Sequence, residues 1–267
     1  MTALTRFGAL IIGDEILSGR RTDAHLAHVI AALTARGMAL AWAHYIGDEP
    51  ARIESELRAA IAAGDVLFSF GGIGATPDDH TRQCAGRALG RPLALHPQAE
   101  RLIEQRIREL AAERGEAEVD LASPEHRRRL QMGVFPEGAE IIPNPYNRIP
   151  GFSVGDLHFM PGFPVMAHPM LDWLLDTRYA GATHRSAEQV LAVRVRGTNE
   201  SRLIPCFEQI EASYAGVRIF SLPSVDHPRF GPHVEIGVKG TDAAQVAQAM
   251  STLRGLALSI GAEIAPE

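Results

Sequence analysis

The stretch 66–79, VLFSFGGIGATPDD, joins a continuous apolar run to a glycine-rich turn. The run 66–70 is short and unbroken, which is typical of a strand buried on both faces of a sheet. Gly71, Gly72 and Gly74 allow backbone conformations and a close ligand approach that a Cβ atom would prevent. A plain strand-to-helix connection explains one glycine well but three poorly. The turn is therefore predicted to hold a ligand.

The residues after the turn predict the start of a helix. Thr76 is expected as the N-cap and Pro77 as the first helical residue, with the helix stopping at Gly90. Unpaired N–H groups at such a start favour a bound phosphate. Asp78 and Asp79 would lie in the first turn, where they would repel a phosphate unless one or both hold a divalent cation. For Asp78, a favourable interaction with the helix dipole is an equal alternative.

Apolar runs and helical spacings alternate on both sides of this turn. The alternation predicts right-handed crossovers and a mainly parallel sheet covered on both faces. Ligands bind such sheets beyond the carboxyl ends of the strands. Asp14, Glu15, the glycine turn and the turn 161–164 are therefore expected at one edge. Strands are predicted at 9–12, 38–46, 66–70, 140–142 and 157–160, and helices at 22–36, 50–63, 77–89, within 96–131, and at 166–175.

Small and polar residues at 178–188 predict a linker between two domains, 1–180 and 186–267. In the second domain, strands are expected at 190–195, 217–222 and 234–238, and helices at 199–214 and 243–258. This β-α-β-β-α order in a short segment predicts a small open-faced α+β sandwich.

Composition excludes several classes of function. The net charge of −6 gives no general attraction to nucleic acid, so no nucleic-acid partner is expected. The N-terminus has no signal-peptide layout and no apolar run approaches about 20 residues, so a cytoplasmic protein without a membrane partner is expected. Lys239 is the only lysine, which excludes a P-loop. Cys84 and Cys206 have no metal-ligand spacing and are expected to be buried thiols.

Three further polar positions have competing interpretations. His25 and His28 lie three apart on a predicted helix, a spacing that can bind metal, but no third ligand is apparent. Ordinary surface or half-buried histidines are the favoured interpretation. Arg82 could reach a phosphate, but a solvated surface residue is favoured.

Several motifs resemble the molybdopterin-binding-like (MoaB/Mog) domain of the competence/damage-inducible protein A (CinA) family. They are IGDEILSG at 12–19, GGIGATPDDHTR at 71–82, PNP at 143–145 with PGF at 150–152, and MPGFP at 160–164. The resemblance covers roughly residues 6–175 and implies an α/β three-layer sandwich with a mainly parallel sheet. The second domain resembles the KH-type domain that follows in this family, although 199–214 contains no Gly-x-x-Gly loop for gripping RNA. The amidohydrolase domain of longer members has no counterpart in this sequence.

The resemblance also implies a function. Relatives of this domain act as metal-dependent pyrophosphatases on ADP-ribose-like or FAD-like dinucleotides, and more distant ones bind or adenylylate molybdopterin. It implies a small phosphorylated ligand (a nucleotide or molybdopterin), a divalent cation (Mg, Mn or Co), and a homo-oligomer, a dimer by family analogy. Catalytic roles would fall to Asp79, Asp14 and Glu15, with Asp79 and Asp14 holding the cation. Ligand contacts would come from Gly71, Gly72, Gly74, Thr76, Asp78, Thr81, Asn144, Gly151, Pro161 and Gly162.

One position departs from the family pattern. The last motif of the family reads Pro-Gly-x-Pro-x-Glu-Met, and its glutamate corresponds to Met166 in this chain. A thioether neither binds a hard cation nor acts as a base. Two hypotheses therefore stay open: a metal-dependent pyrophosphatase, and a non-catalytic binder or sensor of a pterin or nucleotide.

Overall fold

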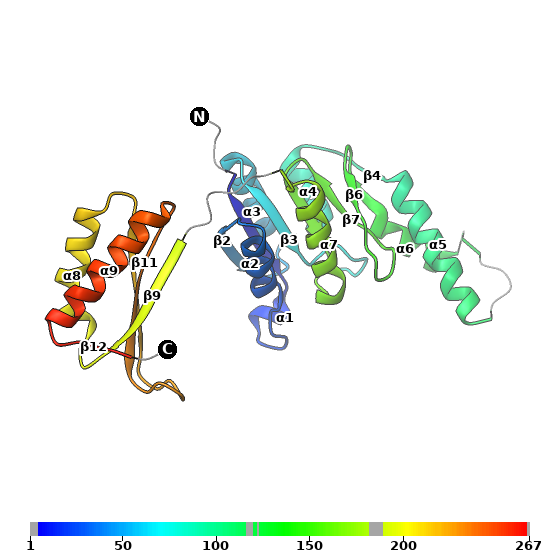
Figure 1. The fold of residues 1–267 in the computed structure, drawn as a ribbon. Helices are drawn as coiled ribbons and strands as arrows, with labels where there is room; N and C mark the ends of the chain where they lie inside the picture. The colour runs from blue at the N-terminus through cyan, green and yellow to red at the C-terminus, as the bar shows by residue number, and fades with distance from the viewer. Residues whose placement is uncertain (1–4, 116–119, 122, 182–188, 266–267) are drawn as a thin grey trace. The chain divides into compact units, whose positions relative to one another are not determined.

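The computed structural model describes residues 5–115, 120–121, 123–181 and 189–265 (Figure 1). The chain divides into two compact units, Met1–Thr183 and His184–Glu267. Much of the expected linker, residues 182–188, lies outside the described residues. In the described part of the chain, no helix has the length and apolar character needed to cross a membrane.

The first unit is built on a six-stranded sheet with the order β2-β1-β3-β8-β7-β6. The first four of these strands run parallel, and β7 and β6 run antiparallel to their neighbours. The prediction of a mainly parallel sheet is therefore confirmed. The strands are β1 (Phe7–Ile12), β2 (Leu40–Ile46), β3 (Val66–Phe70), β6 (Glu140–Ile142), β7 (Gly151–Val154) and β8 (Leu157–Met160).

Helices cover both faces of this sheet, which makes the unit a three-layer α/β sandwich (Figure 1). Successive side chains of a strand point to opposite faces, so β3 supplies both cores. Phe68 packs with α2 (His25–Ala35) and α7 (Pro164–Thr177), whereas Leu67 packs with α3 (Pro50–Ala63) and α4 (Thr81–Leu89). This double burial explains why the run is apolar in character at every position except Ser69.

Three short strands were not predicted. β7 is part of the antiparallel end of the main sheet, and β4 (Leu93–Leu95) and β5 (Val134–Pro136) form a separate two-stranded sheet. Each has only three or four residues. The rest of the expected helix-rich stretch consists of α5 (Pro97–Glu113), α6 (Pro124–Leu130) and the 3-10 turn η1 (Gln131–Gly133).

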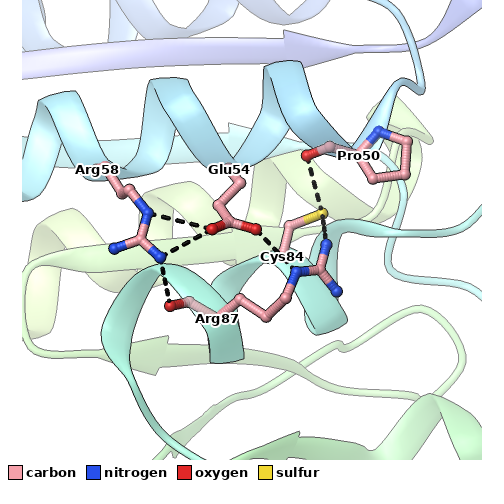
Figure 2. Close-up of polar contacts among 5 residues, drawn as sticks. All are labelled: Pro50, Glu54, Arg58, Cys84 and Arg87. Carbon is pink, nitrogen blue, oxygen red and sulfur yellow. Dashed lines mark hydrogen bonds and ion pairs between the residues drawn. The ribbon is translucent and has the colours of Figure 1, made fainter.

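A polar cluster joins α3 to α4 (Figure 2). The Glu54 carboxylate accepts hydrogen bonds from Arg58 Nη2 and Arg87 Nε, each at 2.8 Å. Arg87 also donates to the sulfur of Cys84 at 3.1 Å, and the Cys84 thiol lies 3.4 Å from the carbonyl oxygen of Pro50. Burial raises the pKa of the Cys84 thiol. Both cysteines are free and buried, as expected.

The second unit is a four-stranded antiparallel sheet, order β10-β11-β9-β12, with α8 and α9 packed on it. Val195 and Ile236 of the sheet form one core with Leu203 of α8 and Leu253 of α9. The predicted α+β architecture is therefore correct, and only the short β12 was missed. The elements are β9 (Gln189–Arg196), α8 (Glu200–Ser213), β10 (Arg218–Ser224), β11 (His233–Gly240), α9 (Ala243–Ser259) and β12 (Glu263–Ile264).

Candidate ligand-binding site

A pocket of about 550 Å³ lies at the carboxyl edge of the parallel strands in the first unit. The glycine loop, defined as residues 71–79, follows β3 and forms one wall. Residues after β1, β2 and β8 add further walls, as the topology of a parallel sheet requires. The lining residues are Ile12, Gly13, Glu15, Arg21, Asp48, Gly71, Gly72, Ile73, Gly74, Ala75, Thr76, Asp78, Asp79, Met132, Asn144, Asn147, Ile149, Pro150, Pro161, Gly162, Phe163 and Met166.

The antiparallel strand β7 explains why residues 144–150 reach the same pocket. Because β7 runs opposite to β8, its N-terminal end lies at the edge where β8 ends. The loop that precedes β7 therefore faces the turn that follows β8. The sequence predicted that the motifs after the parallel strands would meet at this edge, and the structure adds this reversed strand to the arrangement.

Gly71 and Gly72 have backbone angles φ of +103° and +67°, a region that favours glycine. A Cβ atom at Gly71 would overlap the carbonyl oxygen of Ile12, and one at Gly72 would overlap the hydroxyl of Thr81. The packing of the protein itself therefore requires both glycines, independently of any ligand.

Asp79 closes the glycine loop on itself. Its Oδ1 accepts a hydrogen bond from the N–H of Gly74 at 2.9 Å, and its Oδ2 accepts from the N–H of Thr76 at 2.8 Å. The Thr76 hydroxyl lies 2.5 Å from the same Oδ2. The carboxylate thus supports the wall of the pocket that it also lines.

The start of helix α4 differs from the prediction. α4 begins at Thr81, so Thr76 is not its N-cap, Pro77 is not its first residue, and Asp78 and Asp79 precede it. The local capping pattern was overridden because the Asp79 side chain bonds back to loop N–H groups. The predicted alignment of helix N–H groups with a phosphate at this point is therefore wrong.

Thr81 and Arg82 lie behind the loop. The hydroxyl of Thr81 donates to the carbonyl oxygen of Gly71 at 3.0 Å, and its side chain is fully buried. Arg82 is only 4% exposed, so its interpretation as a solvated surface residue is wrong. Both residues support the glycine loop, and neither lines the pocket.

Four acidic side chains line the pocket: Glu15, Asp48, Asp78 and Asp79. Asp14 does not. Its N–H donates to Asp48 Oδ2 at 2.9 Å, and its Oδ1 accepts from the N–H of Asp48 at 3.3 Å. This reciprocal pair turns the Asp14 carboxylate toward the loop after β2.

Asp48 is a candidate site residue that the sequence interpretation missed. Burial, followed by the nearby charges of Asp14, Glu15 and Asp78, raises the pKa of its carboxyl group. Its position after the second parallel strand is the signal that could have identified it.

Carboxylate oxygens are the ligands that hard divalent cations prefer, so the chemistry of this acidic wall fits such an ion. In the arrangement shown, no three His, Cys, Asp or Glu side chains of the described residues gather closely enough to hold a metal. Of the acidic residues that line the pocket, Glu15 and Asp78 would supply carboxylate oxygens to such an ion.

The opposite side of the pocket is largely apolar, formed by Met132, Ile149, Pro150, Phe163 and Met166. The Arg21 guanidinium lies 5.7 Å from the centre of the Phe163 ring.

Two asparagines shape this side. Asn144 is buried, and its Nδ2 donates to Asn147 Oδ1 at 2.8 Å and to the carbonyl oxygen of Ile149 at 2.9 Å. Asn147 Nδ2 lies 3.6 Å from the sulfur of Met166. Gly151, expected to contact ligand, lies in β7, where a Cβ atom would overlap the carbonyl oxygen of Phe159. It does not line the pocket.

Histidines of α2 and α7 pack beside the turn that follows β8. His25 is buried, its Nε2 lies 3.2 Å from the carbonyl oxygen of Gly162, and its ring stacks on Phe70. His168 of α7 stacks on His28 with ring centres 3.9 Å apart. The structure therefore brings a third histidine to the pair singled out in the sequence, while no metal-holding group of three forms among the described residues.

The first unit is an α/β domain with a pocket at the carboxyl edge of its parallel strands, where the glycine loop lies beside acidic side chains. The chain belongs to the family described as "Probable molybdopterin binding domain", whose sequence model matches residues 8–180.

Two similar relatives are CinA-like proteins. That of Anaeromyxobacter sp. (strain Fw109-5) is 29% identical over 262 residues, covering 92% of this chain and 58% of the relative. That of Desulfovibrio desulfuricans is 34% identical over 166 residues, covering 60% of this chain and 36% of the relative. The chain thus spans about half the length of these relatives or less.

A solved structure of similar fold is the protein CinA, with unknown function, from Thermoplasma acidophilum. Its TM-score is 0.54 at 24% identity, and the match covers 64% of this chain and 98% of that one. This similarity supports the fold, and the family assignment rests on the sequence matches.

Proposed function

We propose that this protein binds a phosphorylated nucleotide or pterin, with its phosphates on the glycine loop and its ring against the apolar side of the pocket. One observation carries the proposal. Within the described residues, the N–H groups of Gly72, Ile73 and Ala75 have no protein acceptor, and all three residues line the pocket. Gly72 and Ile73 are adjacent, Ala75 lies two positions further on, and unpaired N–H groups gathered in one turn suit an anion. The family name, which refers to molybdopterin, supports the same class of ligand.

The acidic wall extends the proposal to cleavage of a diphosphate bond in an ADP-ribose-like or FAD-like dinucleotide. A divalent cation bound there by Glu15 or Asp78 would neutralise phosphate charge. Asp48, whose pKa is raised, is suited to accept a proton from an attacking water molecule. Asp79 would hold the loop that orients the phosphates.

A second candidate is a binder or sensor without turnover. Met166 lines the pocket at the position where the family motif carries glutamate. Its thioether cannot supply the oxygen ligand or the base that a carboxylate would supply. A pocket with this side chain would retain the glycine loop and the apolar side for binding.

The two candidates are separated by one experiment. Purified protein is incubated with ADP-ribose or FAD and with Mg²⁺, Mn²⁺ or Co²⁺, while binding is measured by thermal shift. Stabilisation with product formation supports the pyrophosphatase, and stabilisation without product supports the binder. The absence of both effects for every combination would refute the pyrophosphatase and the nucleotide binder.

A further inference from the structure

The glycine loop has a buried positive charge behind it. Arg82 is 4% exposed, and its Nη2 donates to the carbonyl oxygen of Gly74 at 2.5 Å. Its Nη1 donates to the carbonyl oxygen of Gln131. Its Nε is buried and has no hydrogen-bond partner. Among the described residues, no carboxylate forms an ion pair with this guanidinium.

Such burial is unfavourable for a charged group unless something compensates for the lost water. Burial lowers the pKa of Arg82, and the charge of nearby Asp79 partly opposes that effect. An arginine nevertheless keeps its proton in proteins. Both oxygens of Asp79 are already engaged by loop donors, so the carboxylate is fixed in the loop and does not move to pair with Arg82.

We propose that Arg82 is a fixed counter-charge behind the glycine loop, a positioning residue that makes this loop select ligands with an anionic phosphate. This inference rests on the proposed function, which places the phosphate on that loop. Arg82 does not line the pocket, so it acts through the protein rather than by contact. Its positive field acts over a short distance through a poorly hydrated interior, where screening is weak.

A peptide unit transmits part of this effect. The carbonyl oxygen of Gly74 and the N–H of Ala75 belong to the same peptide group. A hydrogen bond from a cation to that oxygen polarises the group and makes its N–H a stronger donor. Ala75 lines the pocket, and its N–H has no acceptor within the described residues. Arg82 therefore strengthens a donor of a residue that lines the pocket.

The second bond of Arg82 joins two walls of the pocket. Gln131 opens η1, and the next residue, Met132, lines the apolar side. One guanidinium thus fixes the glycine loop relative to Met132. This geometry predicts that Arg82 sets both the charge preference of the phosphate position and its distance from the ring position.

The test compares Arg82→Gln, which removes the charge, with Arg82→Lys, which retains it. Binding of ADP-ribose, AMP, inorganic pyrophosphate and uncharged adenosine is measured by calorimetry on the full chain. Arg82→Gln should weaken AMP and ADP-ribose binding at least tenfold and change adenosine binding less than twofold. Arg82→Lys should retain most of the preference for AMP over adenosine. Arg91→Gln, which removes an exposed arginine bonded to the carbonyl of Glu137, should match wild type.

Two outcomes would overturn the inference while leaving the proposed function intact. One is wild-type affinity for AMP in Arg82→Gln, and the other is an equal loss of the preference in Arg82→Lys and Arg82→Gln. If Arg82→Gln does not fold, the ratio of AMP affinity to adenosine affinity in Arg82→Lys is the test. Loss of the preference for AMP in Arg82→Lys would then overturn the inference. Failure of the wild-type protein to bind any of the phosphorylated probes would instead overturn the proposed function, and the role of Arg82 with it.

Discussion

The carboxylate of Asp79 bonds back to the N–H of Gly74, five positions earlier in the chain, at 2.9 Å. This contact means that an acid expected to hold a cation also holds the loop in shape. The two roles can be separated, because the neighbouring Asp78 is exposed and lines the same pocket. Hydrogen bonds from the Thr76 hydroxyl and from its own N–H lower the pKa of Asp78, but it accepts no bond from the N–H of Gly74 or Thr76.

We expect Asp79→Ala to lower the free energy of unfolding by about 1–3 kcal/mol, because it removes the acceptor of several charge-assisted hydrogen bonds. Asp78→Ala should change it by less than about 0.5 kcal/mol, as is usual at exposed positions. Urea unfolding measures both variants. Equal stability of the two variants would show that the Asp79 contacts do not stabilise the loop.

Gly72 and Gly64 offer a matched pair of substitutions. Both have left-handed backbones, with φ of +67° and +66°, but a Cβ atom at Gly64 meets nothing within 4 Å whereas one at Gly72 overlaps Thr81. Gly64→Ala should cost about 1–2 kcal/mol from backbone strain alone. Gly72→Ala should cost about 3 kcal/mol or more, because overpacking adds to the strain. Chemical denaturation of both variants checks the difference, and equal losses would contradict the packing argument.

A buried histidine predicts acid sensitivity of the first unit. His158 bonds to the Ser153 hydroxyl at 2.7 Å and to the Tyr179 hydroxyl at 2.6 Å, and burial lowers its pKa from 6.5 to about 3. The unfolded chain takes up this proton near pH 6.5, whereas the folded protein takes it up only near pH 3. The free energy of unfolding therefore decreases as the pH falls through this window, by up to about 1.4 kcal/mol per pH unit.

His158→Asn should remove this contribution to the slope of unfolding free energy between pH 6 and pH 4, although it lowers stability at pH 7. Tyr179→Phe should keep the slope, because burial rather than the hydroxyl is the main cause of the shift. Urea titrations across this pH range provide the measurement. An unchanged slope in His158→Asn would assign the acid sensitivity to other groups.

Met166 provides a direct test of the two candidate functions. Met166→Glu restores the carboxylate of the family motif, and we expect it to raise metal-dependent turnover of ADP-ribose at least tenfold over wild type. Met166→Gln is the uncharged control of the same shape and should not do so. Product release is followed by chromatography with Mn²⁺ present. Similar rates in all three proteins would remove the argument that Met166 limits hydrolysis.

Most of the architecture could be predicted because its signals are local. The run 66–70 reads as a doubly buried strand, and the β-α order of the second unit follows from short periodic segments. The missed strand β7 depends on pairing with β6 and β8, and the start of α4 depends on a loop that the Asp79 side chain closes. Asp79 bonds back to Gly74, and no capping rule based on neighbouring residues contains that bond.

The candidate site shows the same division. The glycine loop and Glu15 stand out in the sequence because they follow recognisable strands, and both line the pocket. Asp48 follows a predicted strand in the same way and could have been identified from it. Met132 and Asn147 have no comparable signal, because their places in the pocket depend on how separate loops meet. Arg82 was misjudged because its burial is created by the loop folded over it.

The reversed strand β7 has an evolutionary consequence. Because of it, residues 144–150 reach the pocket as a connecting loop that is not part of the parallel strands. The glycine loop, in contrast, is held in place by Asp79 and Thr81. Mutations in such a connection are tolerated more easily than mutations in the strands beside it. Related proteins could therefore bind ligands with different rings through changes in 144–150, while the glycine loop keeps binding the phosphates in the same way.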